Sequence, residues 1–514
     1  MNEPSSHSTP RSRRRGCALL LLVLLLVLAG LYGFLALKAN REVEDAVAEI
    51  ERVDPRWQLD DIEADRTVLP EKENSAFTAM GVKPMMPDKW PIWQIPQPAN
   101  EPNVEEKRDA LDKSFAELEP QRQLNEEQIE ILRAELVRAS RALDKARTLA
   151  DKPEGRYPIT YSADFIGTLL PYLQDTRQVG SLLANDVLLQ AQEKHYDRAL
   201  TSCRAILNAG RSIGDEPLLI SQLVRYALRS IAVNKIQRTL AQGEPSEAAL
   251  GELQRLLEKE EAEPLLLIAV RGERAGMDRL LEGIQSGKLP MSGKDLAMAA
   301  GLSGSKSPPV WMQTQALRLP SVRTWQRAAM LRHMTRAVEI AKMPLEQQEQ
   351  EMEQLDAAAK TQPLLVRLLC PAIAKVAAAD RRIRVELRCA FVAVAAERYR
   401  QTKKKWPASL EALREAGYLA QIPMDLYDGQ PLRMRRTDEG LLIYSVGPDG
   451  QDNGGHIDRT DPLAKGTDRV FHLWDVSKRR QEAAPLKLPQ PANGPGGPPD
   501  FGPLPAVPPA GPGK

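Results

Sequence analysis

The sequence predicts a mainly α-helical fold with a single N-terminal transmembrane helix, an extracytoplasmic array of antiparallel helices, and a small α+β module near the C-terminus. Three observations lead to this prediction. Residues 16–37 form an uncharged apolar run. From residue 104 to about residue 400, apolar side chains recur at helical spacing between short turns. Aromatic residues are only 5% of the 514 residues, which is low for an all-β protein and ordinary for a helical one.

The composition argues against several classes of site. Lys plus Arg (70) nearly balance Asp plus Glu (69), so the net charge of +1 gives no field that favours nucleic acid as a partner. The cysteines form no CxxC pair, which argues against a zinc site and a disulfide scaffold. They are Cys17, Cys203, Cys370 and Cys389. No catalytic or nucleotide-binding motif occurs, so the sequence assigns no catalytic and no cofactor-binding residue.

The apolar run at residues 16–37 predicts a transmembrane helix. A bilayer core of about 30 Å needs about 20 residues at a rise of 1.5 Å each, and this run is long enough. Arginines precede the run, whereas the two basic residues after it are followed at once by acidic ones. The flanking charges are Arg11, Arg13, Arg14 and Arg15, then Lys38, Arg41, Glu42, Glu44 and Asp45. This asymmetry predicts a cytoplasmic basic tail at residues 1–15, the lipid bilayer as partner of residues 16–37, and an extracytoplasmic body.

A cleaved signal peptide is the competing interpretation of the same run. The apolar region of a signal peptide is normally about 7–15 residues long, and this one is longer. The small residues that would mark a cleavage site, Ala36 and Ala39, are interrupted by Leu37 and Lys38. We therefore favour an uncleaved anchor.

Residues 38–103 are predicted to form a juxtamembrane helix followed by a proline-rich arm. Apolar residues at helical spacing continue past the membrane until Pro55. Six further prolines then exclude long elements up to about residue 102. The tryptophans Trp57, Trp90 and Trp93 form either a binding or bilayer-interface surface or anchors that hold the arm on the body, and we favour the second interpretation.

Residues 104–365 are predicted to form a helical domain. Ser246 is expected as an N-cap, and Pro264 as the first residue of the next helix. Small and aromatic residues around Tyr196 are weakly similar to a tetratricopeptide hairpin, but no clean 34-residue repeat accompanies them. Glycines and prolines between about 288 and 320 predict a long loop.

Residues 366–480 are predicted to form a long helix, ending near Gln401, that carries a small antiparallel sheet. Short motifs that suit strand ends and turns follow the helix in a fixed order. They are Trp406-Pro407, Gly417-Tyr418-Leu419, Ile422-Pro423-Met424-Asp425, Asp428-Gly429-Gln430-Pro431-Leu432 and Tyr444-Ser445-Val446-Gly447-Pro448-Asp449-Gly450.

In this order and at these spacings, the motifs resemble the C-terminal part of the major pseudopilin of type II secretion systems, the protein G-like family. The resemblance covers about residues 385–460 and implies a small fold rather than an enzymatic activity. The N-terminal segment departs from the family, because it has no processing site and no acidic residue just inside the apolar run. The resemblance therefore concerns the C-terminal fold and does not extend to assembly into a fibre.

An Asp-rich loop at residues 445–461 is the one site-like cluster in the sequence. Hard oxygen donors and glycines alternate there, as calcium ligation requires. The equivalent loop of the pseudopilin family binds calcium, and the resemblance implies Asp449, Asp452 and Asp458 as side-chain ligands. The family's paired acidic residues are missing, since Gly455-His456-Ile457-Asp458 stands in their place. The alternative is an Asp/Gly turn closed by its own hydrogen bonds.

Residues 481–514 contain 11 Pro and 6 Gly and are predicted to be a disordered tail. The sequence as a whole favours a membrane-anchored structural or protein-interaction protein with a protein partner on its helical body. Two alternatives remain open: a component of a type II secretion or pilus-like assembly, and an extracytoplasmic enzyme with a cleft between the helices.

Overall fold

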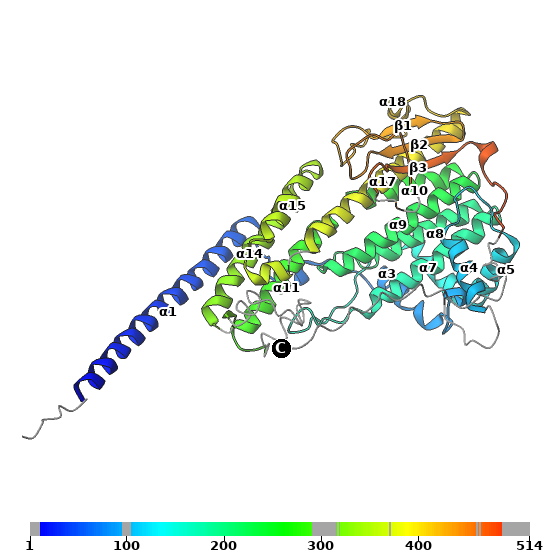
Figure 1. The fold of residues 1–514 in the computed structure, drawn as a ribbon. Coiled ribbons are helices and arrows are strands. Elements are labelled where there is room, and N and C mark those ends of the chain that lie inside the picture. Colours follow the sequence, from blue (N-terminus) through cyan, green and yellow to red (C-terminus); the bar gives the residue numbers. More distant parts are fainter. Residues whose placement is uncertain are drawn as a thin grey trace, which may run out of the picture.

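A computed structural model describes residues 11–94, 104–289, 316–317, 319–369, 372–458, 461 and 464–485. As predicted, these residues are mainly helical and include a small antiparallel sheet near the C-terminus. Figure 1 shows the long helix α1 projecting from the helical body, with the sheet on the side of the body away from the start of α1. The predicted loop at 288–320 lies largely outside the described residues, as does the predicted tail beyond Pro485.

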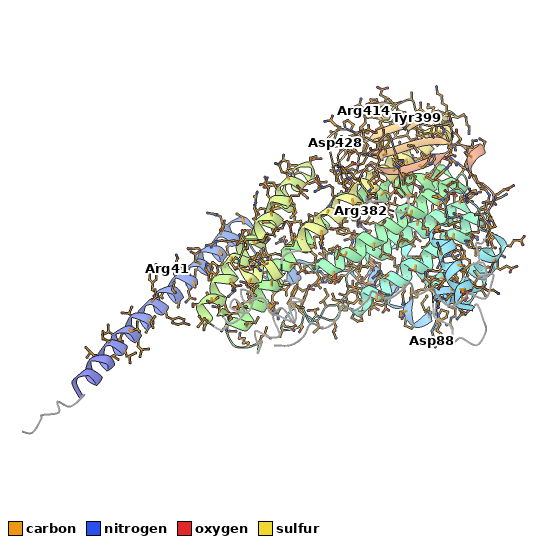
Figure 2. The ribbon with its side chains drawn as sticks, in the orientation of Figure 1. Arg41, Asp88, Arg382, Tyr399, Arg414 and Asp428 are labelled. Atoms are coloured by element: carbon orange, nitrogen blue, oxygen red, sulfur yellow. The ribbon has the colours of Figure 1, made fainter. Side chains whose placement is uncertain are left out.

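Helix α1 is one continuous helix, Arg11–Val53, that includes the whole predicted membrane segment, residues 16–37, and the predicted juxtamembrane helix. In the described part of the chain it is the one helix long and apolar enough to cross a membrane. Its leucines from Leu19 to Leu37 are exposed and stand clear of the body (Figure 2). From Ala39 onward the helix buries one side, and it ends two residues before Pro55, as predicted.

The proline-rich arm contains more helical structure than predicted. It contains the helices α2 (Leu59–Asp65) and α3 (Ser75–Met80) and two 3₁₀ turns, Lys83–Met85 and Ile92–Gln94. The tryptophans hold the arm on the body, as we favoured. Trp57 is 1% exposed, and buried Trp93 stacks on Phe115 with ring centroids 5.0 Å apart. Trp90 Nε1 donates to the Glu135 carbonyl oxygen at 3.2 Å.

The body is a succession of helices joined mostly by short connections. They are α4 (Val104–Ala116), α5 (Glu126–Arg138), α6 (Ser140–Arg147), α7 (Pro171–Gln192), α8 (Tyr196–Arg211), α9 (Leu219–Gln242), α10 (Glu247–Ala262), α11 (Leu265–Gln285), α14 (Pro320–Lys342), α15 (Leu345–Ala359), α16 (Leu364–Leu369), α17 (Ala372–Lys403) and α18 (Leu410–Glu415). Ser246 caps α10 as predicted, its Oγ accepting from Ala249 N at 3.2 Å. Helix α11 begins at Leu265, one residue later than predicted, so Pro264 is its N-cap residue and not its first helical residue.

The sheet has the order β1-β2-β3, with strands Arg433–Arg436, Gly440–Ser445 and Arg469–Trp474. Both pairs are antiparallel, and Ile443 of the central strand lies opposite Phe471 of β3. Every residue of β2 is buried. The sheet packs on α17 and α9 (Figure 1), so the apolar residues of β2 and β3 enter the core of the helical body.

Two hydrophobic cores lie on either side of the middle of α17, within the predicted segment 366–480. The first joins α5–α10 to the second half of α17 and the sheet. The second joins α2, α11 and α14–α16 to the first half of α17. Within α17, Ile383 belongs to the second core and Val385 to the first. The long helix therefore ties the two cores together.

The start of the predicted tail is docked on the body. Gln481 N donates to the Gln121 carbonyl oxygen at 2.8 Å, and Gln123 N donates to the Gln481 carbonyl oxygen at 2.9 Å. Arg122 Nη1 also reaches the Glu482 carbonyl oxygen at 3.3 Å. These bonds use backbone groups, which every residue carries, so a composition poor in apolar side chains does not prevent them. The first two residues of the predicted tail are therefore attached to the body.

Candidate functional site

The three predicted calcium ligands lie in separate hydrogen-bonded turns after β2. Asp449 and Asp452 each accept a hydrogen bond from the backbone N–H two residues later, at 3.1 and 2.9 Å. Asp458 accepts one from the N–H three residues later, at 3.1 Å. Backbone hydrogen bonds lower the pKa of Asp449. This is the arrangement of Asp/Gly turns that the alternative interpretation expects.

A calcium site at this loop gains no support from the geometry. The described residues contain no group of three or more His, Cys, Asp or Glu side chains placed to hold a metal ion. Calcium needs six to eight oxygens gathered around one point. Calcium binding by Asp449, Asp452 and Asp458 therefore stays a prediction from the resemblance alone.

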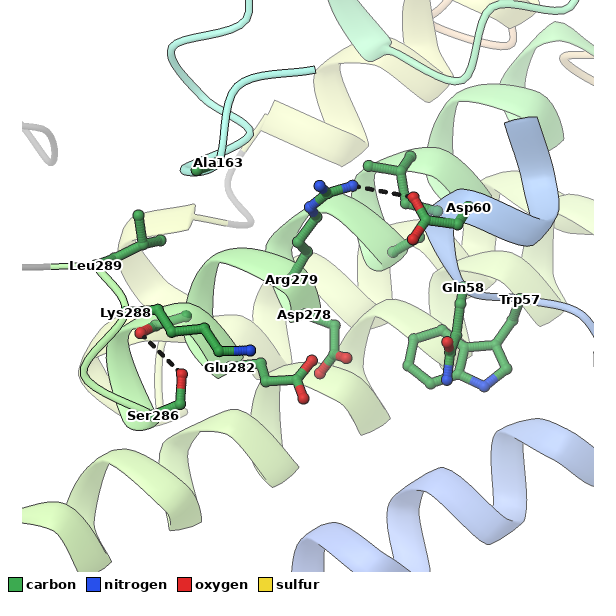
Figure 3. A pocket seen from close by; sticks show the side chains of 13 residues that line it. Trp57, Gln58, Asp60, Ala163, Asp278, Arg279, Glu282, Ser286, Lys288 and Leu289 are labelled. Atoms are coloured by element: carbon green, nitrogen blue, oxygen red, sulfur yellow. Dashed lines mark hydrogen bonds and ion pairs between the residues drawn. The ribbon is translucent and has the colours of Figure 1, made fainter. Parts of the chain in front are cut away.

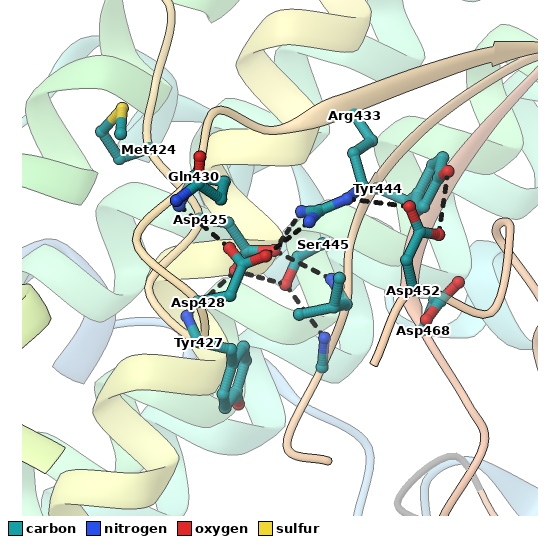
Figure 4. Close-up of polar contacts among 12 residues, drawn as sticks. Met424, Asp425, Tyr427, Asp428, Gln430, Arg433, Tyr444, Ser445, Asp452 and Asp468 are labelled. Carbon is teal, nitrogen blue, oxygen red and sulfur yellow. Dashed lines mark hydrogen bonds and ion pairs between the residues drawn. The ribbon is translucent and has the colours of Figure 1, made fainter. Parts of the chain in front are cut away.

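A protein cation lies among the carboxylates of this region. Arg433, at the start of β1, forms ion pairs with three aspartates (Figure 4). Its Nη1 lies 3.2 Å from Asp425 Oδ2, its Nε lies 3.0 Å from Asp452 Oδ2, and its Nη2 contacts Asp428. Of the three predicted calcium ligands, the guanidinium pairs with Asp452. No sequence signal singles out Arg433, because its three partners lie in two different loops.

Asp425 joins two of the motifs on which the pseudopilin resemblance rests. Its side chain is fully buried. Its Oδ1 accepts from Ser445 Oγ at 2.7 Å, and its Oδ2 accepts from Val446 N at 2.8 Å. Burial raises the pKa of Asp425, and these hydrogen bonds oppose the rise. Asp425 thus fastens the Pro-x-Asp turn to the end of β2, which is a structural role.

A polar cavity of about 350 Å³ lies where the arm meets α11 (Figure 3). Its lining includes Asp60, Asp278 and Glu282, the kind of carboxylate group that the enzyme alternative requires. Each of these carboxylates has an arginine partner. Arg327 donates to Asp278 from Nε at 2.7 Å and from Nη2 at 2.9 Å. Glu282 lies 3.9 Å from Nη2 of the same guanidinium. Asp60 pairs with Arg279 at 3.1 Å. Each of the three carboxylates named here is therefore paired with an arginine.

A buried charge cluster joins the end of α1 to α11. Asp54, one residue after α1, lies 3.0 Å from Arg271 Nε and also contacts Arg274. Hydrogen bonds and charge from both arginines outweigh burial and lower the pKa of Asp54. Arg274 is completely buried, and its guanidinium lies 5.4 Å from the ring centroid of Trp57. Arg271 and Arg274 therefore serve the attachment of α1.

Comparison with known proteins gives no family for this chain: no family model, no curated protein and no solved structure matches it. The pseudopilin resemblance accordingly rests on the motifs of residues 385–460. The geometry of the described residues is what supports a function.

Proposed function

We propose that the chain is a membrane-anchored, extracytoplasmic structural or protein-interaction protein whose anchor is a rigid stalk. One observation carries the proposal. The apolar segment and the body-contacting segment belong to a single uninterrupted helix, and that helix is fixed to the body by buried charges.

Two contacts hold the stalk at different heights. Glu42 Oε2 lies 2.6 Å from Arg332 Nη1 on α14, and Asp54 is held by Arg271 and Arg274 on α11. Twelve helical residues separate the two points, which corresponds to about 18 Å along the axis. A helix fixed at two such points keeps both its direction and its rotation. Ala46 and Ile50 fill the space between them against Leu331 and Trp57.

A stalk of this kind suits a protein that presents a surface to a partner. A flexible linker would let the body sample many orientations above the bilayer, whereas a docked helix keeps one. Removing one member of a buried ion pair typically costs about 3–5 kcal/mol, so the attachment at Asp54 is not a weak surface contact. The proposed orientation, with residues 1–15 in the cytoplasm, follows the excess of arginines before the apolar run.

The pseudopilin-like character of the C-terminal module is part of the proposal. It is supported by the long helix α17 with an antiparallel sheet on its second half and by the Asp425–Ser445 link between two motifs. Co-purification with pseudopilins would instead favour the alternative of a secretion or pilus-like assembly. Substrate turnover that depends on Asp278 would favour the enzyme alternative.

Cysteine labelling tests the anchor and its orientation. In a variant with Cys17 and Cys370 replaced by serine, Lys360→Cys on the exposed end of α15 should react with a membrane-impermeant maleimide in intact cells. Ser12→Cys should react only after permeabilisation. The reverse pattern would contradict the orientation, and release of the protein by alkaline carbonate would contradict the anchor. Cys203 and Cys389 are buried and give little background.

Spin-label distances test the stalk itself. Labels at Lys38→Cys and Glu346→Cys, in the same background and in nanodiscs, should give one narrow distance distribution. Asp54→Asn combined with Arg332→Ala should broaden it, because both fixing points are lost. The control variant Arg279→Ala removes an exposed pair and should leave the distribution narrow. A broad distribution in the unaltered stalk would show a flexible tether.

A further inference from the structure

A second and larger cavity lies between the helical body and the sheet. Its volume is about 740 Å³, within the range of small-molecule sites. It is bounded by the residues after α4, by α9 and α17, and by β3. Asn234 and Glu117 line it and are exposed, so the cavity opens to solvent. It shares no lining residue with the cavity beside Trp57.

Three cationic side chains line this cavity. Lys235 and Arg238 lie one turn apart on α9, and Arg469 begins β3. Arg238 is 3% exposed and donates from Nη1 to the Glu119 carbonyl oxygen at 3.1 Å. Its Nε and Nη2 are buried without a hydrogen-bond partner, and so are Nε and Nη2 of Arg469. Four buried donors on two guanidinium groups are thus unsatisfied.

The acidic side chains that line the cavity are bound by other groups: Glu117 pairs with Lys113 and Glu119 with Arg122. Ser230 Oγ donates to Glu386 at 3.2 Å. Burial raises the pKa of Glu386, and the charge of Arg469 opposes the rise. Asp468 accepts from Gly455 N at 2.6 Å and from Asn453 N at 3.3 Å. Burial, together with the charge of Arg238, lowers the pKa of Lys235 to about 8. Burial also lowers the pKa of Arg238 to about 9.

Unpaired buried charge is unfavourable, and clusters of perturbed groups in a cleft are typical of ligand sites. Water in the cavity could satisfy the free N–H donors, but it would not balance the charge. An anion does both. Leu188, Val233 and Phe471 form an apolar part of the same lining.

We propose that the cavity binds a small organic anion, whose acidic head is held by Lys235, Arg238 and Arg469 and whose apolar part packs on Leu188, Val233 and Phe471. This binding function is independent of the membrane anchor. Arg238 and Arg469 are the main recognition residues, since a guanidinium can donate two parallel hydrogen bonds to a carboxylate or a phosphate. Lys235 adds charge.

The test uses the full chain in nanodiscs of zwitterionic lipid, with calorimetric titration and thermal melting. The probes are hexanoate, hexyl phosphate, inorganic phosphate and hexanol. We expect hexanoate or hexyl phosphate to bind and to raise Tm, and comparison of the two identifies the preferred head group. Hexanol should have no effect. An equal response to hexanol would overturn anion recognition, and inorganic phosphate binding as tightly as both hexyl probes would overturn the role of the apolar lining. No response to any probe would identify a water-filled structural cavity.

Variants locate the binding. Arg238→Met should lower the affinity for the tightest-binding probe at least 10-fold, and Lys235→Met should lower it by a smaller factor. The control Lys360→Met changes an exposed lysine on another face and should bind normally. We expect Arg238→Met to fold, because it replaces an uncompensated buried charge by an apolar side chain of similar length. Should it fail to fold, Lys235→Gln decides: unchanged affinity in that variant would place the anion elsewhere.

Discussion

The guanidinium of Arg479 and the carboxylate of Glu397 form a buried ion pair, with Nη2 2.9 Å from Oε2, that fastens the chain after β3 to α17. Nη1 of the same arginine donates to the Gly243 carbonyl oxygen at 2.8 Å, at the end of α9. Arg400 also binds Glu397, at 2.7 Å. Three segments far apart in the sequence are thereby held at one point, and hydrogen bonds and charge from both arginines outweigh burial to lower the pKa of Glu397.

Arg479→Met should destabilise the protein markedly. The substitution leaves the Glu397 carboxylate buried with one arginine fewer, and loss of one partner of a buried pair costs about 3–5 kcal/mol. Chemical denaturation should show this loss of unfolding free energy. Lys478→Met, at the exposed neighbouring position, is the control and should change stability by less than about 0.5 kcal/mol. Equal stability of the two variants would mean that the pair does not hold the segment.

Truncation should separate the docked residues from the rest of the tail. Ending the chain after Pro485 should leave Tm essentially unchanged, because the removed residues are rich in Pro and Gly and poor in groups that bury apolar area. Ending it after Lys478 removes Arg479 and the backbone hydrogen bonds of Gln481, and should lower Tm by several degrees. A large decrease in Tm for the protein that ends after Pro485 would place stabilising contacts beyond that residue.

Arg433→Met should create a response to calcium at the three aspartates that the guanidinium pairs. Without the guanidinium, Asp425, Asp428 and Asp452 repel one another, and a divalent cation can relieve that repulsion. We expect a lower Tm in chelator and a partial recovery in millimolar calcium, since weak extracellular sites bind at about 10⁻⁴–10⁻³ M. The exposed control Arg414→Met should show neither change. If the unaltered protein is itself stabilised by calcium and Asp449→Ala abolishes the effect, the loop is the site that the resemblance implies.

Glu216→Gln should remove a pH dependence of stability. Glu216 is fully buried and accepts from Tyr172 Oη at 2.8 Å, and burial raises its pKa to about 7. The folded state holds this proton up to about pH 7, whereas the unfolded state loses it near pH 4.5. The contribution of Glu216 is therefore complete below about pH 4.5 and is lost as the pH rises to 7, with a total of about 3 kcal/mol. Denaturation of wild type and variant across this range measures the difference. The exposed control Glu282→Gln should keep the wild-type slope, and parallel curves for Glu216→Gln and wild type would contradict the assignment.

Local features of the chain were predictable from the sequence. The apolar run and the period after it predicted a helix through Val53, and Ser246 predicted the start of α10. The end of α17 lies two residues beyond the predicted Gln401. These features depend on residues within one or two turns, where the spacing of apolar side chains and the capping of free N–H groups decide the conformation.

The positions of charged partners were decided by the tertiary structure. Arg433 meets Asp452 across 19 residues, Asp54 meets Arg274 across 220, and Arg479 meets Glu397 across 82. Nothing in the local sequence distinguishes these arginines from the others of the chain. The cavity beside Arg238 likewise exists only because β3 packs near α9. The sequence by itself determined where helices form and which segment can enter a membrane. Which charges are paired and which are left facing a cavity depends on contacts between distant segments, because burial and charge neutralisation are properties of the packed structure.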